Sequence, residues 1–187
     1  MDNMKMRHRA SGFTIVELVV VIILLGILAA TALPRFINID DEAHAAAVSG
    51  VFGSLQTGTS LFHAKWIAQG EPAANTDMGV DFSNLRTNAA GYPYGTTDRS
   101  GGSSNVTDSG DCQAIFTNLL QAGAPSISTA ANAAGVVGSV TDYTAVVNGT
   151  NCDFYYTSQN NQSGQQVELL AYNSATGVIV RTQPNLP

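Results

Sequence analysis

The 187-residue sequence predicts an α+β fold, in which one long N-terminal helix is followed by a C-terminal antiparallel sheet. Three observations support this prediction. Residues 13–33 form an apolar run, residues 34–69 continue it with apolar side chains at helical spacing, and residues 142–182 contain short β-branched and aromatic runs separated by polar turns. We expect the apolar half of the helix to protrude and the amphipathic half to pack on the sheet.

The first element is a short basic leader, residues 1–12, with three basic residues and one acidic residue. The chain has a net charge of −6, so removal of this leader with its charge of +2 would leave −8. Basic residues before an apolar stretch keep the N-terminus in the cytoplasm and let the following part cross the membrane. We therefore expect a single-pass membrane protein whose C-terminal part is exported.

The second element is the apolar run from Phe13 to Leu33, which has 21 residues and a single charge, that of Glu17. As a helix it would be about 32 Å long, enough to cross the hydrocarbon core of a bilayer. A carboxylate there costs roughly 2.5–3.5 kcal/mol on insertion, so a functional partner is expected. No basic residue lies in the run, so that partner must come from outside it, which points to assembly. The alternative is a polar residue tolerated near the membrane interface.

The helix is expected to continue beyond the apolar run to Gln69. Pro34 lacks an amide donor and clashes with the preceding turn, so a kink or a locally melted turn is expected there. Gly70 and Pro72 supply a stop. One face of this half repeats apolar side chains at spacings of three, four and seven, which predicts a buried stripe. The stripe consists of Val48, Val51, Phe52, Leu55, Phe62 and Trp66.

Beyond the helix, residues 71–111 are expected to form loops, because turn-forming residues dominate them. Residues 112–123 have the one-face spacing of a short helix that ends at Gly123. Residues 173–177 (NSATG) are expected to form a hairpin turn. The expected strands are 142–147, 152–157, 166–172 and 177–182.

Cys112 and Cys152 are the two cysteines of the chain. An even number of cysteines in an exported part predicts one disulfide. Closing a loop of about 41 residues would stabilise the fold by roughly 4 kcal/mol in the chain-entropy model. The alternative is two separate buried thiols. A zinc site is disfavoured, because it needs four ligands in a spacing pattern that is missing here.

Enzymatic activity has little support in the sequence. Of the three histidines, His8 lies in the leader, while His44 and His63 lie nineteen residues apart on one expected helix and could not converge within a subunit. No nucleophile elbow, zinc-protease, phosphate-loop or dinucleotide motif occurs. We therefore expect no catalytic residues and no cofactor.

Binding of metal ions or nucleic acid is also disfavoured. The aspartates of the polar loops could supply oxygen ligands for calcium, but they lack the spacing of a calcium-binding loop. The negative net charge argues against nucleic acid, which is bound through neutralisation of its phosphates. The loop aspartates are Asp98, Asp108, Asp111, Asp142 and Asp153.

Residues 12–18 read GFTIVEL, and with the basic leader, Gly26, Pro34 and the apolar run they resemble the precursors of type IVa pilins, the short-leader class of type IV pilin. Within that class the chain is most similar to the pilins of the mannose-sensitive haemagglutinin (MSHA) pilus. This narrower similarity rests on HAKW (63–66), GYP (91–93) and the C-terminal hairpin.

The resemblance implies the pilin fold and three regions. Residues 1–12 would be the prepilin leader, residues 13–40 the transmembrane and filament-core helix, and residues 41–187 the globular domain. Cys112 and Cys152 would bound the variable C-terminal loop of the family. In many members this loop lies nearer the chain end, whereas 35 residues follow Cys152 here.

The resemblance also implies roles for individual residues. Gly12 would be the last leader residue, cut from Phe13 by a prepilin peptidase that also N-methylates Phe13. Glu17 would pair with the N-terminal amine of a neighbouring subunit. Pro34 would mark the stretch that can lose helical form in the filament.

In function, the resemblance implies a structural subunit without catalytic activity. The precursor would sit in the inner membrane, and an assembly platform there would polymerise it into an extracellular filament that attaches to surfaces, biofilms or glycan receptors. One competing interpretation is a pseudopilin of a type II secretion system, which shares the N-terminal motif. A second is a membrane-anchored enzyme or binding protein.

Overall fold

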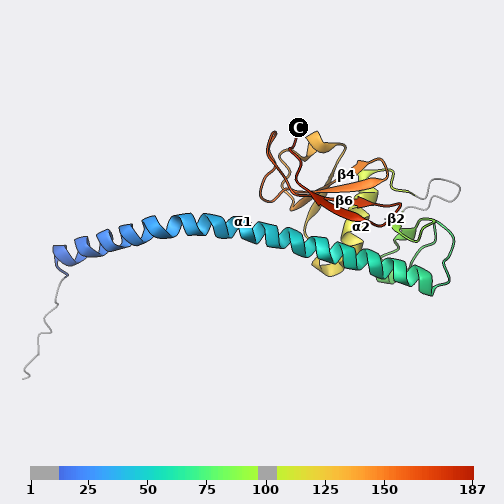
Figure 1. The fold of residues 1–187 in the computed structure, drawn as a ribbon, viewed down its shortest axis with the longest axis horizontal. Coiled ribbons are helices and arrows are strands. Elements are labelled where there is room, and N and C mark those ends of the chain that lie inside the picture. The colour runs from blue at the N-terminus through green and yellow to red at the C-terminus, as the bar shows by residue number, and fades with distance from the viewer. Residues whose placement is uncertain (1–12, 97–104) are drawn as a thin grey trace, which may run out of the picture. The chain divides into compact units, whose positions relative to one another are not determined.

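The computed structural model describes residues 13–96 and 105–187, residues 33–38 through their backbone, and it confirms the α+β fold class. The described chain contains a long helix, α1 (Ile15–Ala68), a shorter helix, α2 (Ser109–Leu120), and two sheets (Figure 1). Contacts between residues divide the chain into two compact units at the step from Ala43 to His44. The C-terminal part of α1 therefore belongs to the second unit, together with α2 and both sheets.

Helix α1 covers 54 residues and includes Pro34 without a break, so the locally melted turn expected there is not observed. It ends at the predicted glycine. Gly70 has a φ of 81°, which glycine adopts at little cost. The N–H groups of Gly70 and Glu71 donate to the carbonyls of Ile67 and Trp66 at 3.0 and 3.1 Å, a pair of bonds known as the Schellman motif.

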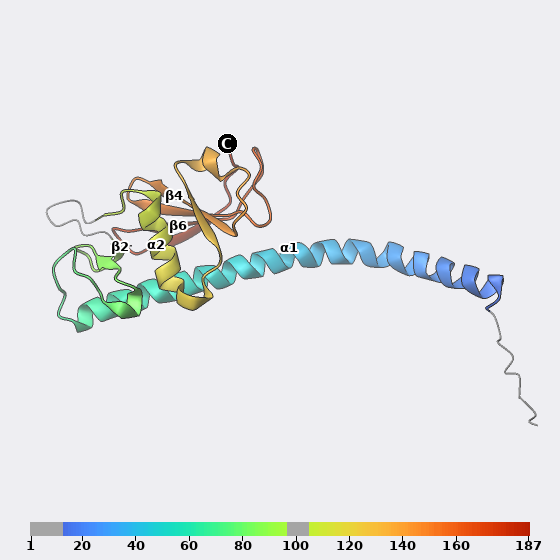
Figure 2. The ribbon, with the colours of Figure 1, turned by 180° about the vertical axis from the view of Figure 1, so that it is seen from behind.

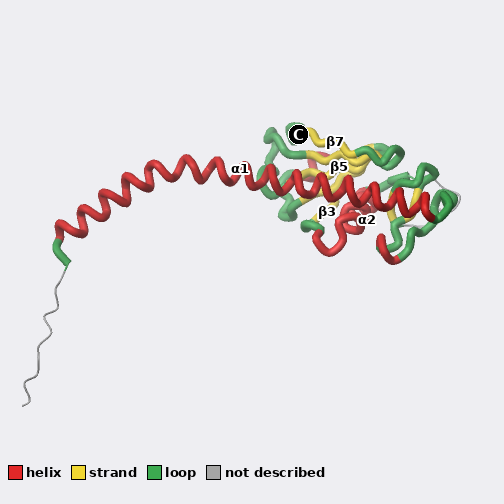
Figure 3. The backbone as a smooth tube through the Cα atoms, turned by 60° about the horizontal axis from the view of Figure 1, so that its bottom comes forward, coloured by secondary structure: helices red, strands yellow, loops and turns green. Residues whose placement is uncertain are grey.

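The main sheet has five strands in the order β3-β4-β5-β6-β7. They are β3 (Ile127–Ala130), β4 (Tyr143–Asn148), β5 (Asn151–Tyr156), β6 (Leu169–Asn173) and β7 (Ile179–Thr182). The strands from β4 to β7 pair antiparallel, as predicted, and appear as adjacent yellow segments in Figure 3. However, β3 pairs parallel with β4.

The four predicted strands are thus antiparallel, and the additional edge strand β3 makes the sheet mixed. After β3, the chain passes through the 3₁₀ turn η3 (Ala133–Val136) before β4 starts beside Ile127. Such a return to the same end of the sheet is what parallel pairing requires, and hairpin signals in the sequence do not reveal it.

Helix α2 spans Ser109–Leu120, so it begins and ends three residues before the predicted range of 112–123. Its N-cap is Asp108, whose Oδ1 accepts the backbone N–H of Asp111 at 2.9 Å. The last three residues of the predicted range, Gln121–Gly123, form a 3₁₀ turn. Figure 2 shows α2 and the main sheet on the same side of the C-terminal half of α1.

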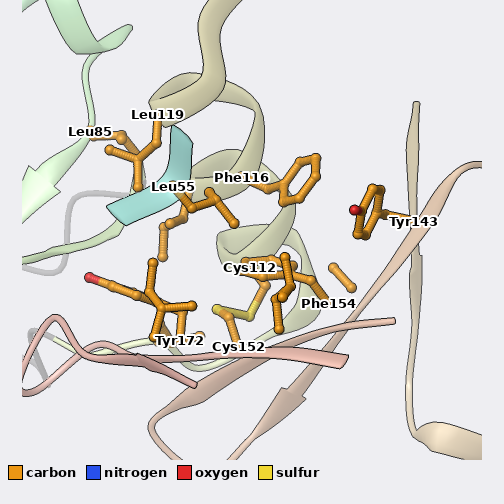
Figure 4. Packing of buried hydrophobic residues seen from close by; sticks show 14 of the residues in the cluster. Leu55, Leu85, Cys112, Phe116, Leu119, Tyr143, Cys152, Phe154 and Tyr172 are labelled. Atoms are coloured by element: carbon orange, nitrogen blue, oxygen red, sulfur yellow. A yellow bond between two sulfur atoms is a disulfide. The ribbon is translucent and has the colours of Figure 1, made fainter. Parts of the chain in front are cut away.

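The core lies between α2, the C-terminal half of α1 and one face of the main sheet. The stripe predicted on α1 supplies Val48, Leu55 and Phe62, all fully buried, while Val51, Phe52 and Trp66 are partly buried against the same core. Side chains from the other elements close it, as Figure 4 shows. They include Phe116 and Leu119 of α2, Tyr143 and Phe154 of the sheet, and Tyr172 of β6.

A smaller apolar cluster covers the opposite face of the sheet and contains Val136, Val146, Tyr155 and Leu186. The segment expected to be loops also holds two short strands, β1 (Arg86–Thr87) and β2 (Pro93–Gly95), which pair antiparallel. The rest of that prediction within residues 97–104 lies outside the described residues.

Candidate functional site

The start of α1 is built by Thr14 and Glu17. The backbone N–H of Glu17 donates to Thr14 Oγ1 at 3.1 Å, while Glu17 Oε2 accepts the backbone N–H of Thr14 at 3.2 Å. The Thr14 hydroxyl is also 3.2 Å from Oε2. This reciprocal arrangement is a capping box, which satisfies two amide donors that a helix N-terminus otherwise leaves open.

Sequence reasoning found Glu17 but missed Thr14. The signal was present, because a threonine followed three residues later by glutamate before an apolar run is the signature of a capping box. Among the described residues, Glu17 Oε1 takes part in no hydrogen bond. One carboxylate oxygen therefore holds the helix start, and the other has no hydrogen-bond partner within residues 13–96 and 105–187.

The helix behind this cap is apolar and uncovered. Ile15–Ala32 is long and apolar enough to cross a membrane, and none of it is buried. The core helix of a soluble protein can be as long and as apolar, but it is mostly buried. A signal sequence near the N-terminus can also have this length and composition. The exposed side chains form an unbroken apolar surface around Glu17. Glu17 thus carries the single charge on a surface whose exposure to water is unfavourable.

The structure describes only some of the other residues for which roles were predicted in this region. Phe13 precedes α1 and is exposed. Gly12, the residue expected on the other side of the cleavage point, lies outside the described residues. Pro34 lies within α1. Cleavage after Gly12, methylation of Phe13 and assembly through Glu17 and Pro34 therefore stay predictions.

The disulfide predicted between Cys112 and Cys152 is present and joins α2 to β5. Both cysteines are fully buried in the main core (Figure 4). Neither thiol is free, so neither can act as a nucleophile or a metal ligand.

His44 and His63 make separate contacts in the second unit. His44 Nδ1 lies 2.6 Å from the Tyr156 hydroxyl. The ring of His63 stacks between Tyr92 and Trp66, with ring centroids 4.6 and 5.3 Å apart, and its Nδ1 is 3.2 Å from the carbonyl of Gly91. His8 lies outside the described residues.

This aromatic stack joins the segments on which the narrower resemblance rests. Gly91 of GYP lies against Trp66 and His63 of HAKW. Tyr92 lies against Gly177 in the turn of the C-terminal hairpin. The stack therefore ties the end of α1, the loop before β2 and the β6–β7 hairpin together.

Four of the loop aspartates form hydrogen bonds with their own surroundings, namely Asp108, Asp111, Asp142 and Asp153, while Asp98 lies outside the described residues. Hydrogen bonds from the hydroxyls of Ser126 and then Ser158, at 2.6 and 2.8 Å, hold the pKa of Asp142 below its ordinary value. Burial raises the pKa of Asp153, although the amide of Asn148 donates to it at 3.0 Å. Within residues 13–96 and 105–187, no three His, Cys, Asp or Glu side chains gather to hold a metal ion.

The comparisons with known proteins concern the N-terminal segment. Residues 7–33 match the family described as the prokaryotic N-terminal methylation motif. A segment of 53 residues is 40% identical to the type IV narrow pilus major component PilA5 of Thermus thermophilus. This match covers 28% of the chain and 46% of the relative, so the chain matches about half of that protein's length. No solved structure matches.

Proposed function

We propose that this chain is a structural subunit of a type IV pilus. The observation that carries the proposal is the apolar, uncovered helix Ile15–Ala32, which lies in a segment that matches the N-terminal methylation motif. Glu17 in this helix uses one carboxylate oxygen to cap the helix start. The similarity to a type IV pilin and the α+β fold with its long N-terminal helix support it.

Processing would start with a prepilin peptidase that cuts after Gly12 and N-methylates Phe13. The regions are then a leader of residues 1–12, an apolar helix of residues 13–40 and a globular domain of residues 41–187. The helix holds the subunit in the inner membrane until an assembly platform moves it into the filament. The exposed position of Phe13 is compatible with access of such an enzyme.

Glu17 would then set the register of the helices in the filament. Cleavage creates an α-amine at Phe13, which is mostly cationic at neutral pH. The open oxygen of Glu17 can accept that amine from a neighbour while Oε2 keeps the helix capped. A charge left without its partner among apolar helices is destabilising by roughly 3–5 kcal/mol. Slippage along the featureless apolar surface would strand both charges, so one axial offset is favoured.

The finer proposal is an MSHA-like pilus that attaches cells to surfaces, biofilms or glycan receptors. It is supported by the cluster that HAKW, GYP and the C-terminal hairpin form in the second unit. A pseudopilin of a type II secretion system is the alternative. In a deletion strain, loss of surface fibres with normal enzyme secretion favours the pilin, and the opposite result favours the pseudopilin.

Mass spectrometry of protein sheared from the cell surface tests the proposal. A mature chain that begins with N-methylated Phe13 is expected in the sheared material. A chain with its leader intact in functional protein would mean a simple membrane anchor and would overturn the proposal.

Two substitutions separate the charge of Glu17 from its role as a cap. Glu17→Gln keeps a side chain that can complete a capping box but removes the charge, whereas Thr14→Ala removes the cap and keeps the charge. Both variants should insert into the membrane, since the apolar run is unchanged. We expect Thr14→Ala to enter filaments and Glu17→Gln to be excluded. Normal filaments of Glu17→Gln would refute the pairing with the amine.

A further inference from the structure

A cavity of about 150 Å³ lies in the second unit, where the loop that follows β5 meets the C-terminal segment of the chain. Residues 159–166 of this loop contain six asparagines and glutamines and no charged residue. The backbone N–H of Val167 donates to the carbonyl of Pro184 at 3.0 Å, which holds the two segments together. Four of the lining residues carry a primary amide, namely Gln159, Asn160, Gln166 and Gln183.

Two of these amides are oriented by hydrogen bonds to acceptors. The Asn160 amide donates to the carbonyl of Gln166 at 3.2 Å, and the Gln183 amide donates to Glu168 Oε1 at 2.6 Å. Each bond must use the NH₂ group, so the side-chain oxygens of Asn160 and Gln183 stay as acceptors without a partner among the described residues. The side chain of Gln166 also has no hydrogen bond within residues 13–96 and 105–187. The wall therefore offers both donors and acceptors.

The same wall offers little surface to an aromatic or apolar ligand. Tyr156 and Val167 also line the cavity, but they are only 8% and 3% exposed. The Tyr156 hydroxyl lies 2.6 Å from His44 Nδ1. A ligand would therefore gain hydrogen bonds here rather than ring stacking. This favours a saturated molecule rich in hydroxyl groups, since a hydroxyl both donates and accepts.

Charge and size narrow the ligand further. Among the described lining residues, Glu168 is the charged one, and Arg181 donates to both of its oxygens at 2.8 Å. These bonds hold the pKa of Glu168 below its ordinary value, so an anion would meet a carboxylate whose counter-ion is already engaged. A cavity of about 150 Å³ in another protein holds benzene, so a single six-membered ring fits the volume found here.

We propose that this cavity binds one neutral hexopyranose ring, either a free sugar or the end of a glycan. The hydroxyl groups of the ring bond to the amides of Asn160, Gln166 and Gln183. Such a cavity would be the contact through which the proposed filament attaches to glycans, so its role at the cell surface rests on the proposed function. Binding itself needs only the single subunit. An uncleaved leader would thus refute the pilus without deciding whether the cavity binds a sugar.

Titration of sugars into the ¹⁵N-labelled full chain tests the cavity. The probes are glucose, galactose and mannose with their methyl glycosides, in micelles of dodecylphosphocholine, a detergent without a sugar headgroup. The amide shifts of Val167 and Glu168 give the Kd. Gln166→Met keeps the length of the side chain and removes its amide. Gln162→Met is the matched control, because Gln162 is an exposed residue of the same loop that does not line the cavity.

We expect a saturable shift with at least one probe, and Gln166→Met should weaken its binding about fivefold, the effect of one lost hydrogen bond. Gln162→Met should leave the Kd unchanged, and the uronate of the bound sugar should bind more weakly. Binding of a methyl glycoside supports the end of a glycan as the ligand, whereas binding of the free hexose alone supports a free sugar. Absence of a saturable shift with all six probes overturns the proposal. Equal effects of the two substitutions, or equal binding of the uronate, overturn it as well.

Discussion

Replacement of Gly91 by alanine should destabilise the second unit through the aromatic stack. Gly91 has a φ of 81°, and a Cβ built on it would lie 2.5 Å from Cδ2 of Trp66 and 2.8 Å from Nδ1 of His63. Real Cβ atoms do not approach ring atoms so closely. The neighbours are the faces of rings already stacked on one another, and they have little room to withdraw.

Two terms set the size of the effect. The left-handed backbone costs alanine about 1–2 kcal/mol. Forcing an extra methyl group into a packed site costs about 1–3 kcal/mol more. Gly91→Ala should therefore lower the free energy of unfolding by about 2–5 kcal/mol. At roughly 2–4 °C per kcal/mol for a domain of this size, the Tm should fall by about 10 °C.

Gly138→Ala is the matched control, because Gly138 also has a positive φ, 77°, but nothing lies within 4 Å of its Cβ position. Gly138→Ala should lower the free energy of unfolding only by the cost of the left-handed backbone. Urea unfolding of the full chain in micelles can be followed by the emission of Trp66, the single tryptophan. If Gly91→Ala and Gly138→Ala lower the free energy of unfolding equally, the steric role of the stack is refuted.

Three further predictions concern the disulfide and two carboxylates. Serine at both Cys112 and Cys152 should lower the free energy of unfolding by roughly 4 kcal/mol, measured by urea unfolding without reductant; a loss below about 1 kcal/mol would contradict the loop-closure argument. Hydrogen bonds lower the pKa of Asp142, and the largest effect comes from the Ser126 hydroxyl. The charged carboxylate therefore contributes fully to the free energy of unfolding above the ordinary pKa, and this contribution is lost as pH falls through the lowered pKa. Asp142→Asn should flatten the acid limb of a plot of Tm against pH. An unchanged acid limb would contradict the stabilising role of the Asp142 carboxylate. Burial raises the pKa of Asp153, so stability falls as pH rises from the ordinary pKa through the raised one. Asp153→Asn should therefore raise the Tm at pH 7 and remove that slope, whereas a lower Tm would show that the charge is needed.

The elements of the fold that rest on local patterns were predictable. The stripe from Val48 to Trp66 is buried as expected, and α1 ends at Gly70 because a glycine can adopt the left-handed conformation that closes the helix. The four predicted strands are present within three residues of their expected ends. These features depend on side-chain period and on the special conformations of glycine, both of which a sequence displays directly.

Features that depend on distant partners were not predictable. Strand β3 (Ile127–Ala130) has only four residues and pairs parallel with β4, so neither a long strand pattern nor a hairpin turn in the sequence predicts it. The start of α2 was placed too late because Asp108 was assigned to a solvated loop rather than to a helix cap.

At the candidate site, the charge of Glu17 in an apolar run is visible in the sequence, whereas its hydrogen-bond partner Thr14 requires recognition of the capping signature.

The disulfide also determines how far the chain can be stretched. Cys112 and Cys152 are 40 residues apart in sequence. Fully extended, those residues would add about 130–140 Å of contour length. While the bond is intact, α2, β3 and β4 cannot be drawn out under tension, even if the rest of the second unit unravels. In the proposed filament, a subunit under load would thus yield by a bounded length, and reduction of the disulfide would release the remainder.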